Sequence, residues 1–450
     1  MNSVEMRTEQ SIEKKFVSYV SRNIWGMIGI SAYILADTFF ISMAEGANGI
    51  TALNLVLPLY SLIFGIGSMI GVGSATRFNI LKTRKDKSCD DYFSNALMFA
   101  VLLSSVFMVA GAFFPGWLIE VLGGDCQIVA IGTPYTRIFM LFAPFFMANY
   151  ICNAFVRNDG NPSLAMKATL LSSLFNIVMD YILMFPLGLG MTGAALATVF
   201  SPIVGILICC KHFFSKENSV RFLWKKPSVL KLFQSCQLGT AALIGEISSG
   251  VTTAIFNFLI LSLAGKDGVA AYGIVANTAI VATSIFNGIS FGAQPILSES
   301  YGKGETQSVK KLLRLAIGCA LICSIGILLL TNLGTETIVS FFNSENNPVM
   351  ENYALTGVRL YFIGFLFAGF NIVGTGYLSA TENAGWAFIT SLLRGIGAIA
   401  FCAFVLAHFF GMTGIWLAFP AAEGITAIVM MIAIRRNGKV CCISLDNPLY

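Results

Sequence analysis

Runs of about 20 or more mostly apolar residues, each long enough to cross a bilayer as a helix, recur along the whole chain and constrain its fold. The composition agrees, because 56% of the 450 residues are hydrophobic and only 11% are charged. Soluble domains carry about 25% charged residues. The chain is therefore expected to be an all-α polytopic membrane protein.

The apolar runs divide into twelve predicted transmembrane helices. Their approximate limits are 17–42, 50–80, 94–119, 132–156, 163–186, 190–211, 232–262, 268–299, 312–333, 353–380, 384–408 and 411–434. An even number of spans places both termini on the same side of the membrane.

Lysine and arginine gather in alternate connections between the predicted spans. They fill 82–87, 211–227 and 301–314, whereas the other connections are nearly free of them, with Lys266 as the exception. Positively charged loops stay in the cytoplasm. We therefore expect a multi-pass protein of the cell membrane with both termini in the cytoplasm. The net charge of +5 follows this topology and gives no reason to expect a nucleic-acid partner.

Three sequence matches at nearly constant spacing indicate an internal repeat. "GMTGAALATVF" starts at Gly190 and "GMTGIWLAFPA" starts at Gly411, 221 residues later. "GITALNLV" (49–56) matches "GVAAYGIV" (268–275) with an offset of 219, and a third match has an offset of 222. The fold is thus expected to contain two pseudo-symmetric six-helix lobes of the same topology, a parallel repeat.

The repeat and the basic loops together predict the domain organisation. The expected parts are a cytoplasmic N-terminal tail (1–16), an N-terminal six-helix lobe (17–211), a cytoplasmic linker (212–231), a C-terminal six-helix lobe (232–434) and a cytoplasmic C-terminal tail (435–450). The eleven cysteines are scattered and only two histidines occur, so neither a disulfide framework nor a zinc site is expected. Membrane lipids surround the chain, and we expect a monomer.

Polar residues inside three spans of the first lobe form the main candidate site. In "SLFNIVMDYILMF" (173–185), Asn176 and Asp180 are one helical turn apart and share a face. Asp37 and Thr198 lie in other spans at similar depth, roughly 7–12 Å below the outer surface at 1.5 Å per helical residue. Charged residues inside a membrane are costly and usually functional.

The chemistry of this cluster suits a coupling cation. Carboxylate, amide and hydroxyl oxygens are ligands for hard cations such as Na⁺. Two close carboxylates in apolar surroundings also suit proton binding, because both cannot stay ionised at low cost. We expect Asp37, Asn176, Asp180 and Thr198 to bind Na⁺ or H⁺, with no other cofactor; the alternative is that the acids face water or cap a helix. The equivalents in the second half are Phe256, Gly397, Phe401 and Phe419.

Three further residues are candidates for a substrate cavity. Glu246, in "ALIGEISSG", and Glu423, in "AAEGITA", lie near the middle of predicted spans. An anionic cavity wall would attract cationic substrates. Asn153 is the third candidate. The alternative for Glu423 is a pairing within the second half, for example with Arg394.

Two other acids are expected in water rather than in a site. Asp159 and Glu299 lie at the cytoplasmic ends of predicted helices. Ionised carboxylates are usually exposed unless they are paired. We therefore expect both side chains to be solvated.

The combined motifs of the chain resemble the multidrug and toxic compound extrusion (MATE) family. The motifs are "ILADTFFIS" (34–42), "GITALNLVLPL" (49–59), "RNDGNPSLAM" (157–166), "NIVMDYILMF" (176–185) and "GMTGAALAT" (190–198). The resemblance covers nearly the whole chain. Within the family, the chain is most similar to prokaryotic multidrug exporters of the staphylococcal type, which have a cation site in the N-terminal lobe.

The resemblance implies a function. It predicts two six-helix lobes around a central cleft, and secondary active export of organic, mostly cationic drugs in antiport with H⁺ or Na⁺ by alternating access. Antibiotic resistance is the expected consequence. The family's cation site falls on Asp37, Asn176, Asp180 and Thr198. Glu246 matches an acid that matters in members with a C-terminal-lobe site, whose other acids have no clear match here.

Three rival functions are weighed against export. A lipid-linked oligosaccharide flippase of the same superfamily would need a strongly cationic cavity, but the spans contain few arginines, among them Arg137, Arg359 and Arg394. A membrane-embedded enzyme would need a nucleophile with a base, a metal cluster or paired catalytic acids, and the chain has no histidine-rich cluster. An ion channel would be recognised by single-channel conductance. We therefore expect a transporter and not an enzyme.

Overall fold

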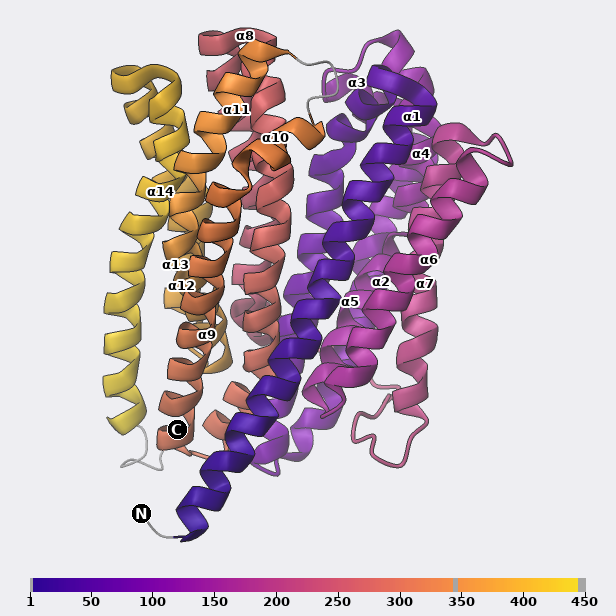
Figure 1. The fold of residues 1–450 in the computed structure, drawn as a ribbon. Helices are drawn as coiled ribbons and strands as arrows, with labels where there is room; N and C mark the ends of the chain where they lie inside the picture. Colours follow the sequence, from indigo (N-terminus) through magenta and orange to yellow (C-terminus); the bar gives the residue numbers. More distant parts are fainter. Residues whose placement is uncertain (1–2, 343–346, 444–450) are drawn as a thin grey trace. The chain divides into compact units, whose positions relative to one another are not determined.

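The computed structural model describes residues 3–342 and 347–443, and helices dominate the described part (Figure 1). Residues 1–2 and 444–450 of the predicted tails lie outside it. The α-helices are α1 (Ser3–Thr83), α2 (Asp91–Phe113), α3 (Pro115–Val121), α4 (Cys126–Leu141), α5 (Ala143–Asn158), α6 (Pro162–Met184), α7 (Gly190–Phe213), α8 (Val229–Gly302), α9 (Thr306–Leu333), α10 (Thr335–Phe342), α11 (Pro348–Tyr361), α12 (Phe365–Ala380), α13 (Ala384–Leu392) and α14 (Ala398–Ile443). Short turns of other helix types are η1 (Lys87–Asp90), η2 (Phe362–Gly364) and η3 (Leu393–Gly397).

The chain forms two compact units. The N-unit is Trp25–Glu246, and the C-unit combines Met1–Ile24 with Ile247–Tyr450. The long helices α1 and α8 therefore each contribute one part to each unit. The predicted cation-binding residues all belong to the N-unit.

Within the described residues, nine helices are long and apolar enough to cross a membrane, or ten if the bent pair α4–α5 forms one span. The chain is thus an all-helical multi-pass membrane protein. With α4–α5 counted as one span, the remaining difference from the predicted twelve lies in two long stretches, Val229–Gly302 and Ala384–Asn437, which are counted once each. A straight 74-residue helix would be about 110 Å long, several times the roughly 30 Å hydrocarbon core. Each stretch contains one glycine with non-helical backbone, Gly265 or Gly411.

Left-handed backbone conformations recur at the spacing of the predicted repeat. Gly46 (φ 62°) and Gly265 (φ 65°) are 219 residues apart and interrupt α1 and α8. The described part of the chain contains ten residues with positive φ. Three further pairs among them are separated by nearly the same distance in the sequence: Lys85 and Gly304 by 219 residues, Gly160 and Glu382 by 222, and Gly190 and Gly411 by 221. The backbone thus repeats where the sequence does.

Two predicted spans contain a break. The predicted helix 132–156 consists of α4 and α5, which are bent by 49°. Pro144, at the second position of α5, lacks the N–H that would continue the helix. The predicted helix 94–119 is interrupted at Phe114, directly before Pro115, because the residue before a proline disfavours the helical conformation.

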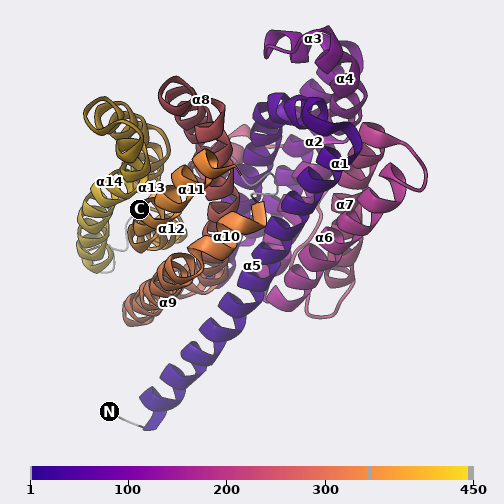
Figure 2. The same cartoon turned by 45° about the horizontal axis from the view of Figure 1, so that its top comes forward.

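Small residues bring three helices of the N-unit into close contact. A Cβ atom on Gly193 of α7 would lie 2.8 Å from the backbone carbon of Leu183, so α7 touches the backbone of α6. Figures 1 and 2 show α6 and α7 running side by side. Gly29 of α1 likewise lies against Leu170 and Ser173 of α6. These contacts fix the helices that carry the polar residues of the candidate site.

Candidate functional site

The four predicted cation ligands lie on three neighbouring helices of the N-unit. Asp37 is on α1, Asn176 and Asp180 are on α6, and Thr198 is on α7. Asn176 and Asp180 are completely buried, and Asp37 and Thr198 are 9% and 6% exposed. The sequence therefore identified four buried polar side chains.

The two acids lie within electrostatic range of each other. The charge of Asp37 interacts with that of Asp180. The hydroxyl group of Tyr135, on α4, lies within electrostatic range of both carboxylates. Tyr33, one turn before Asp37 on α1, is within range of both carboxylates. The structure thus brings the acids of α1 and α6 into one cluster.

Buried polar atoms of this cluster lack hydrogen-bond partners in the described part of the chain. They include Oδ1 of Asp37, both carboxylate oxygens of Asp180 and both amide atoms of Asn176. The Thr198 hydroxyl neighbours Tyr135 but has no hydrogen bond of normal geometry. Burying an ionised carboxylate without a partner costs several kcal/mol. A proton or a bound cation would remove that cost.

Tyrosine residues of the cluster were missed in the sequence analysis. Tyr60 and Tyr135 are buried and joined by a hydrogen bond between their hydroxyl groups. The chain contains 38 Phe residues, and packing was a sufficient explanation for this aromatic content, so the tyrosines were not considered separately. The available signal was the residue type: Tyr33, Tyr60 and Tyr135 carry hydroxyl groups inside apolar spans of a chain whose aromatic residues are mostly Phe.

Two of the cavity candidates lie in the N-unit. Glu246 is half-buried on α8, beside Gly65 of α1, and its charge reaches Tyr33. The same tyrosine is within electrostatic range of Asp37. Asn153 instead donates its amide to the Thr169 hydroxyl (3.0 Å) and thereby joins α5 to α6.

The third cavity candidate is part of the C-unit scaffold. Glu423 is 2% exposed and accepts from Arg394 Nε (2.7 Å) and from Asn371 Nδ2 (2.7 Å). The pairing with Arg394, weighed as the alternative, is the one found. In this pairing, each carboxylate oxygen of Glu423 accepts one hydrogen bond from a side chain of the C-unit.

The equivalents of the polar cluster in the C-unit are different in kind. Phe256 and Phe419 occupy the positions of Asp37 and Thr198, and both lie against Tyr361. The rings of Tyr361 and Phe419 stack at 4.3 Å between centroids. Phe401, at the position of Asp180, is exposed. The C-unit thus has aromatic packing where the N-unit has carboxylates.

The prediction that Asp159 is solvated is wrong. Its side chain is fully buried and accepts from Lys82 Nζ (2.6 Å), His212 Nε2 (2.8 Å) and the Ser219 N–H (2.8 Å), and also from the Ser219 hydroxyl. Burial alone would raise the pKa of Asp159, but these hydrogen bonds lower it to about 2. The cause is the linker after α7, which folds back over the carboxylate. Glu299 is 28% exposed and pairs with two lysines.

Comparison with known proteins identifies relatives over most of the chain. The MatE family profile matches residues 24–182 and 242–405. The chain is 27% identical over 412 residues to the multidrug export protein MepA of Staphylococcus aureus, covering 89% of both proteins. It is equally identical over 411 residues to MepA of Staphylococcus saprophyticus, again covering 89% of both.

Solved structures share the fold at lower identity. An outward-facing multidrug resistance transporter of the MATE family and MOP superfamily matches with a TM-score of 0.90, at 20% identity and with 96% of each chain covered. A MOP superfamily transporter from Pyrococcus furiosus, whose binding pocket has reversed polarity, matches with a TM-score of 0.89, at 20% identity and with 96% of each chain covered.

Proposed function

Because the chain belongs to the MATE family of membrane transporters, and is therefore no enzyme, we propose that it is a secondary active exporter of organic, mostly cationic drugs. Relatives named as multidrug export proteins match 89% of the chain. In addition, the N-unit combines unpartnered acids with several buried tyrosines. Acidic and aromatic groups together suit organic cations, which bind to carboxylates and to aromatic faces.

The proposed topology has twelve spans in two lobes of six. It follows if α8 and the helix that ends with α14 each cross the membrane twice, turning at Gly265 and Gly411, and α4 with α5 crosses once. The paired left-handed residues support this arrangement, because Gly46 breaks α1 where Gly265 breaks α8. The positive-inside rule then places both termini and the linker in the cytoplasm.

The proposed coupling site consists of Asp37, Asn176, Asp180 and Thr198. The observation that carries it is the set of buried, unpartnered oxygens on α1 and α6. Carboxylate, amide and hydroxyl oxygens fit Na⁺, and the paired acids equally fit a proton. Either ion would neutralise carboxylates that otherwise remain uncompensated in an apolar environment.

The coupling ion and the drug exchange by alternating access in this proposal. Drug enters from the cytoplasm or the inner leaflet, and a cation from outside then binds to Asp37 and Asp180. Neutralising the acids removes the anionic partner of the drug, which leaves to the outside. One charge that crosses 100 mV supplies about 2.3 kcal/mol, which supports a concentration gradient of roughly 40- to 50-fold.

Transport in proteoliposomes tests the proposal. Ethidium export is measured under a pH gradient and under a sodium gradient, imposed separately, for wild type, Asp37→Asn and Asp180→Asn. One of the two gradients should drive export by the wild type, and both variants should lose gradient-driven export by at least tenfold. The matched control is Glu120→Gln, which removes an exposed acid of the N-unit and should leave export unchanged.

Two results would contradict the proposal. Wild-type export by both Asp variants would remove the coupling role of the acids. Lipid-linked oligosaccharide translocation without any response to either gradient would instead favour the flippase. Folding of each variant is checked by its elution as a single peak in size-exclusion chromatography.

A further inference from the structure

The linker between α7 and α8, residues 214–228, is fixed to the N-unit along its length. Ser219 donates its N–H and its hydroxyl to Asp159. Further along, the Leu223 N–H donates to Ser94 Oγ (2.6 Å), and the Ser228 N–H donates to Asn95 Oδ1 (2.6 Å). A connection held at three points presents its remaining side chains in a fixed arrangement.

The apolar side chains of this linker differ in their exposure to the surroundings. Val220 is 4% exposed and packs in the hydrophobic core of the N-unit. Phe222 and Trp224 are 50% and 88% exposed, and their rings are 5.9 Å apart. A soluble connection would rarely expose two large aromatic rings together. Trp is instead enriched where membrane and water meet.

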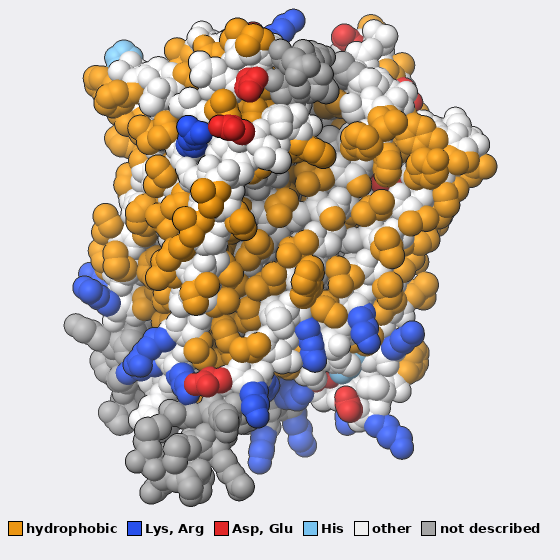
Figure 3. Space-filling model, in the orientation of Figure 1, with side chains coloured by type: hydrophobic (Ala, Val, Ile, Leu, Met, Phe, Trp, Pro, Cys, Tyr) orange, Lys and Arg blue, Asp and Glu red, His pale blue; other side chains and the backbone are white. Residues whose placement is uncertain are grey.

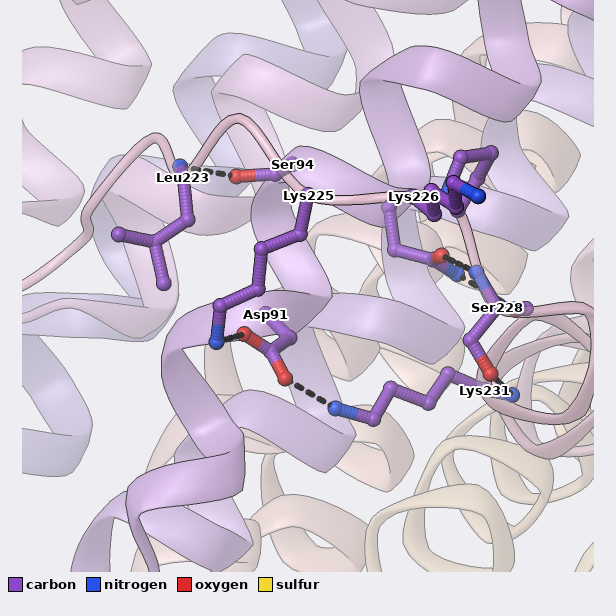
Figure 4. A pocket seen from close by; sticks show the side chains of 9 residues that line it. Asp91, Ser94, Leu223, Lys225, Lys226, Ser228 and Lys231 are labelled. Atoms are coloured by element: carbon purple, nitrogen blue, oxygen red, sulfur yellow. Dashed lines mark hydrogen bonds and ion pairs between the residues drawn. The ribbon is translucent and has the colours of Figure 1, made fainter.

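Three lysines that follow the exposed rings in the sequence, Lys225, Lys226 and Lys231, line a small cavity (Figure 4). Lys225 binds one carboxylate oxygen of Asp91 (2.9 Å), and Lys231 binds the other from the opposite side. Lys226 is exposed and has no partner in the described part of the chain. Asp86 also lies within electrostatic range of Lys231. Among the three lysines, Lys226 is therefore the one whose charge has no ion pair within the described residues.

The linker lies where the apolar helices of the N-unit end. It follows directly on Phe213 at the end of α7, and α8 begins after it with exposed Val229, Leu230 and Phe233. In Figure 3, Lys and Arg side chains gather at this end of the N-unit, next to hydrophobic side chains over its helices. Exposed rings, a cluster of lysines and the ends of apolar helices thus occur together in this short stretch of the chain.

We propose that the linker is a binding site for an anionic phospholipid of the cytoplasmic leaflet. Lys225, Lys226 and Lys231 bind the headgroup phosphate, and Phe222 and Trp224 enter the boundary between headgroups and acyl chains. The side of the membrane rests on the proposed topology, but the site does not depend on drug export.

The exposed rings favour a lipid over a soluble anion. A free phosphate needs only the lysines and gives no role to Phe222 and Trp224. A phospholipid uses both features, since basic pockets at the cytoplasmic ends of transmembrane helices bind anionic headgroups. Each cation near an anionic surface contributes about 1 kcal/mol, which is roughly a fivefold change in affinity.

Quenching of Trp224 fluorescence by brominated lipids tests this site. The full-length protein is reconstituted in nanodiscs of phosphatidylcholine with increasing fractions of brominated phosphatidylglycerol or, separately, brominated phosphatidylcholine. The Trp224 contribution is the difference between wild type and Trp224→Phe, which leaves the other four Trp residues in place. We expect brominated phosphatidylglycerol to quench this contribution at least tenfold more effectively.

Lysine variants then identify the headgroup contact. Lys226→Gln breaks no ion pair and should weaken the preference for phosphatidylglycerol roughly fivefold; Lys225→Gln/Lys226→Gln should weaken it further. The matched control, Lys310→Gln/Arg314→Gln, removes two exposed cations of α9 and should retain the wild-type preference.

Three outcomes would overturn the lipid site. They are equal quenching by the two lipids, an unchanged preference in the double lysine variant, and loss of the preference on adding millimolar inorganic phosphate at constant ionic strength. The third would assign the lysines to a soluble anion. Because no outcome depends on ethidium export, failure of this site is distinguishable from failure of the transport proposal.

Discussion

Asp159 and Asp180 are both buried carboxylates, but their surroundings differ in a way that separates scaffold from site. Asp159 accepts hydrogen bonds from Lys82, His212 and Ser219. Neither oxygen of Asp180 has a partner within residues 3–342 and 347–443. A fully paired carboxylate stabilises the fold, whereas an unpaired one costs free energy unless it binds a positive ion.

The scaffold role of Asp159 predicts a pH-dependent stability. Its pKa of about 2 lies below the ordinary value of 3.8, so its stabilisation is complete above about pH 4 and is lost as the pH falls towards 2. The shift corresponds to about 2 kcal/mol. Asp159→Asn should lower the free energy of unfolding by roughly 3 kcal/mol at pH 7. Thermal unfolding in detergent should show the gap between wild type and variant narrowing below pH 4.

A neighbouring acid provides the control for this measurement. Glu217 lies two residues before Ser219 in the same linker and is exposed. Glu217→Gln should unfold like the wild type at every pH. A gap between wild type and Asp159→Asn that stays constant from pH 7 to pH 2 would contradict the scaffold role.

The sequence predicted the acids of the candidate site better than their partners. Asp37 and Asp180 stand out because charges are rare within apolar runs. The prediction that they lie near each other used only the depth of each residue in its predicted span. Tyr135 and the partners of Asp159 were not predictable in this way. They come from elements brought together by the fold, and neither spacing nor composition specifies which side chain a linker covers.

At the scale of the helices, the two halves end corresponding elements with the same hydrogen bonds. After α1, Asp86 N–H donates to Leu81 O and Lys85 N–H donates to Lys82 O. Residues 219 positions later repeat both bonds at the end of α8, where Gly304 replaces Lys85. This is the Schellman arrangement, whose left-handed position favours glycine.

Replacement of Lys85 by glycine is therefore predicted to stabilise the fold. Lys85 has a φ of 58° and is exposed, and its side chain makes no hydrogen bond or ion pair within the described residues. Lys85→Gly should raise the free energy of unfolding by about 1 kcal/mol, because the left-handed conformation costs about that much for a residue with a Cβ. The reverse change, Gly304→Lys, should lower it by a similar amount. Thermal unfolding in detergent measures both, and a destabilised Lys85→Gly would contradict the assignment.

Helix limits were largely predictable, whereas breaks inside helices were not. The predicted span 163–186 is α6 (Pro162–Met184), and 190–211 is α7 (Gly190–Phe213), because hydrophobicity, Pro and Gly mark these ends. The bend between α4 and α5 was missed. Apolar periodicity continues across it, and proline in a membrane helix can be accommodated without a break.

At the scale of the molecule, the repeat in the backbone contrasts with the asymmetry of the side chains. Gly46 and Gly265 have nearly the same φ, but the position of Asp37 is occupied by Phe256 in the second half. Duplication thus preserves the bends that determine the path of the chain. The polar cluster belongs to one unit, which gives a transporter with two similar halves a single proposed coupling site.

The twelve-span proposal makes a prediction about α8 as a whole. If α8 turns at Gly265, the residues before the start of α8 and those after its end lie on the same side of the membrane. Fusions of a reporter active only in the cytoplasm should be active when placed after Lys216 and after Lys303. A reporter that folds only outside should be active after Lys266. Activity of the outside reporter after Lys303 would mean a single crossing, because the end of α8 would then lie opposite to its start, and the two-lobe arrangement with six spans each would fail.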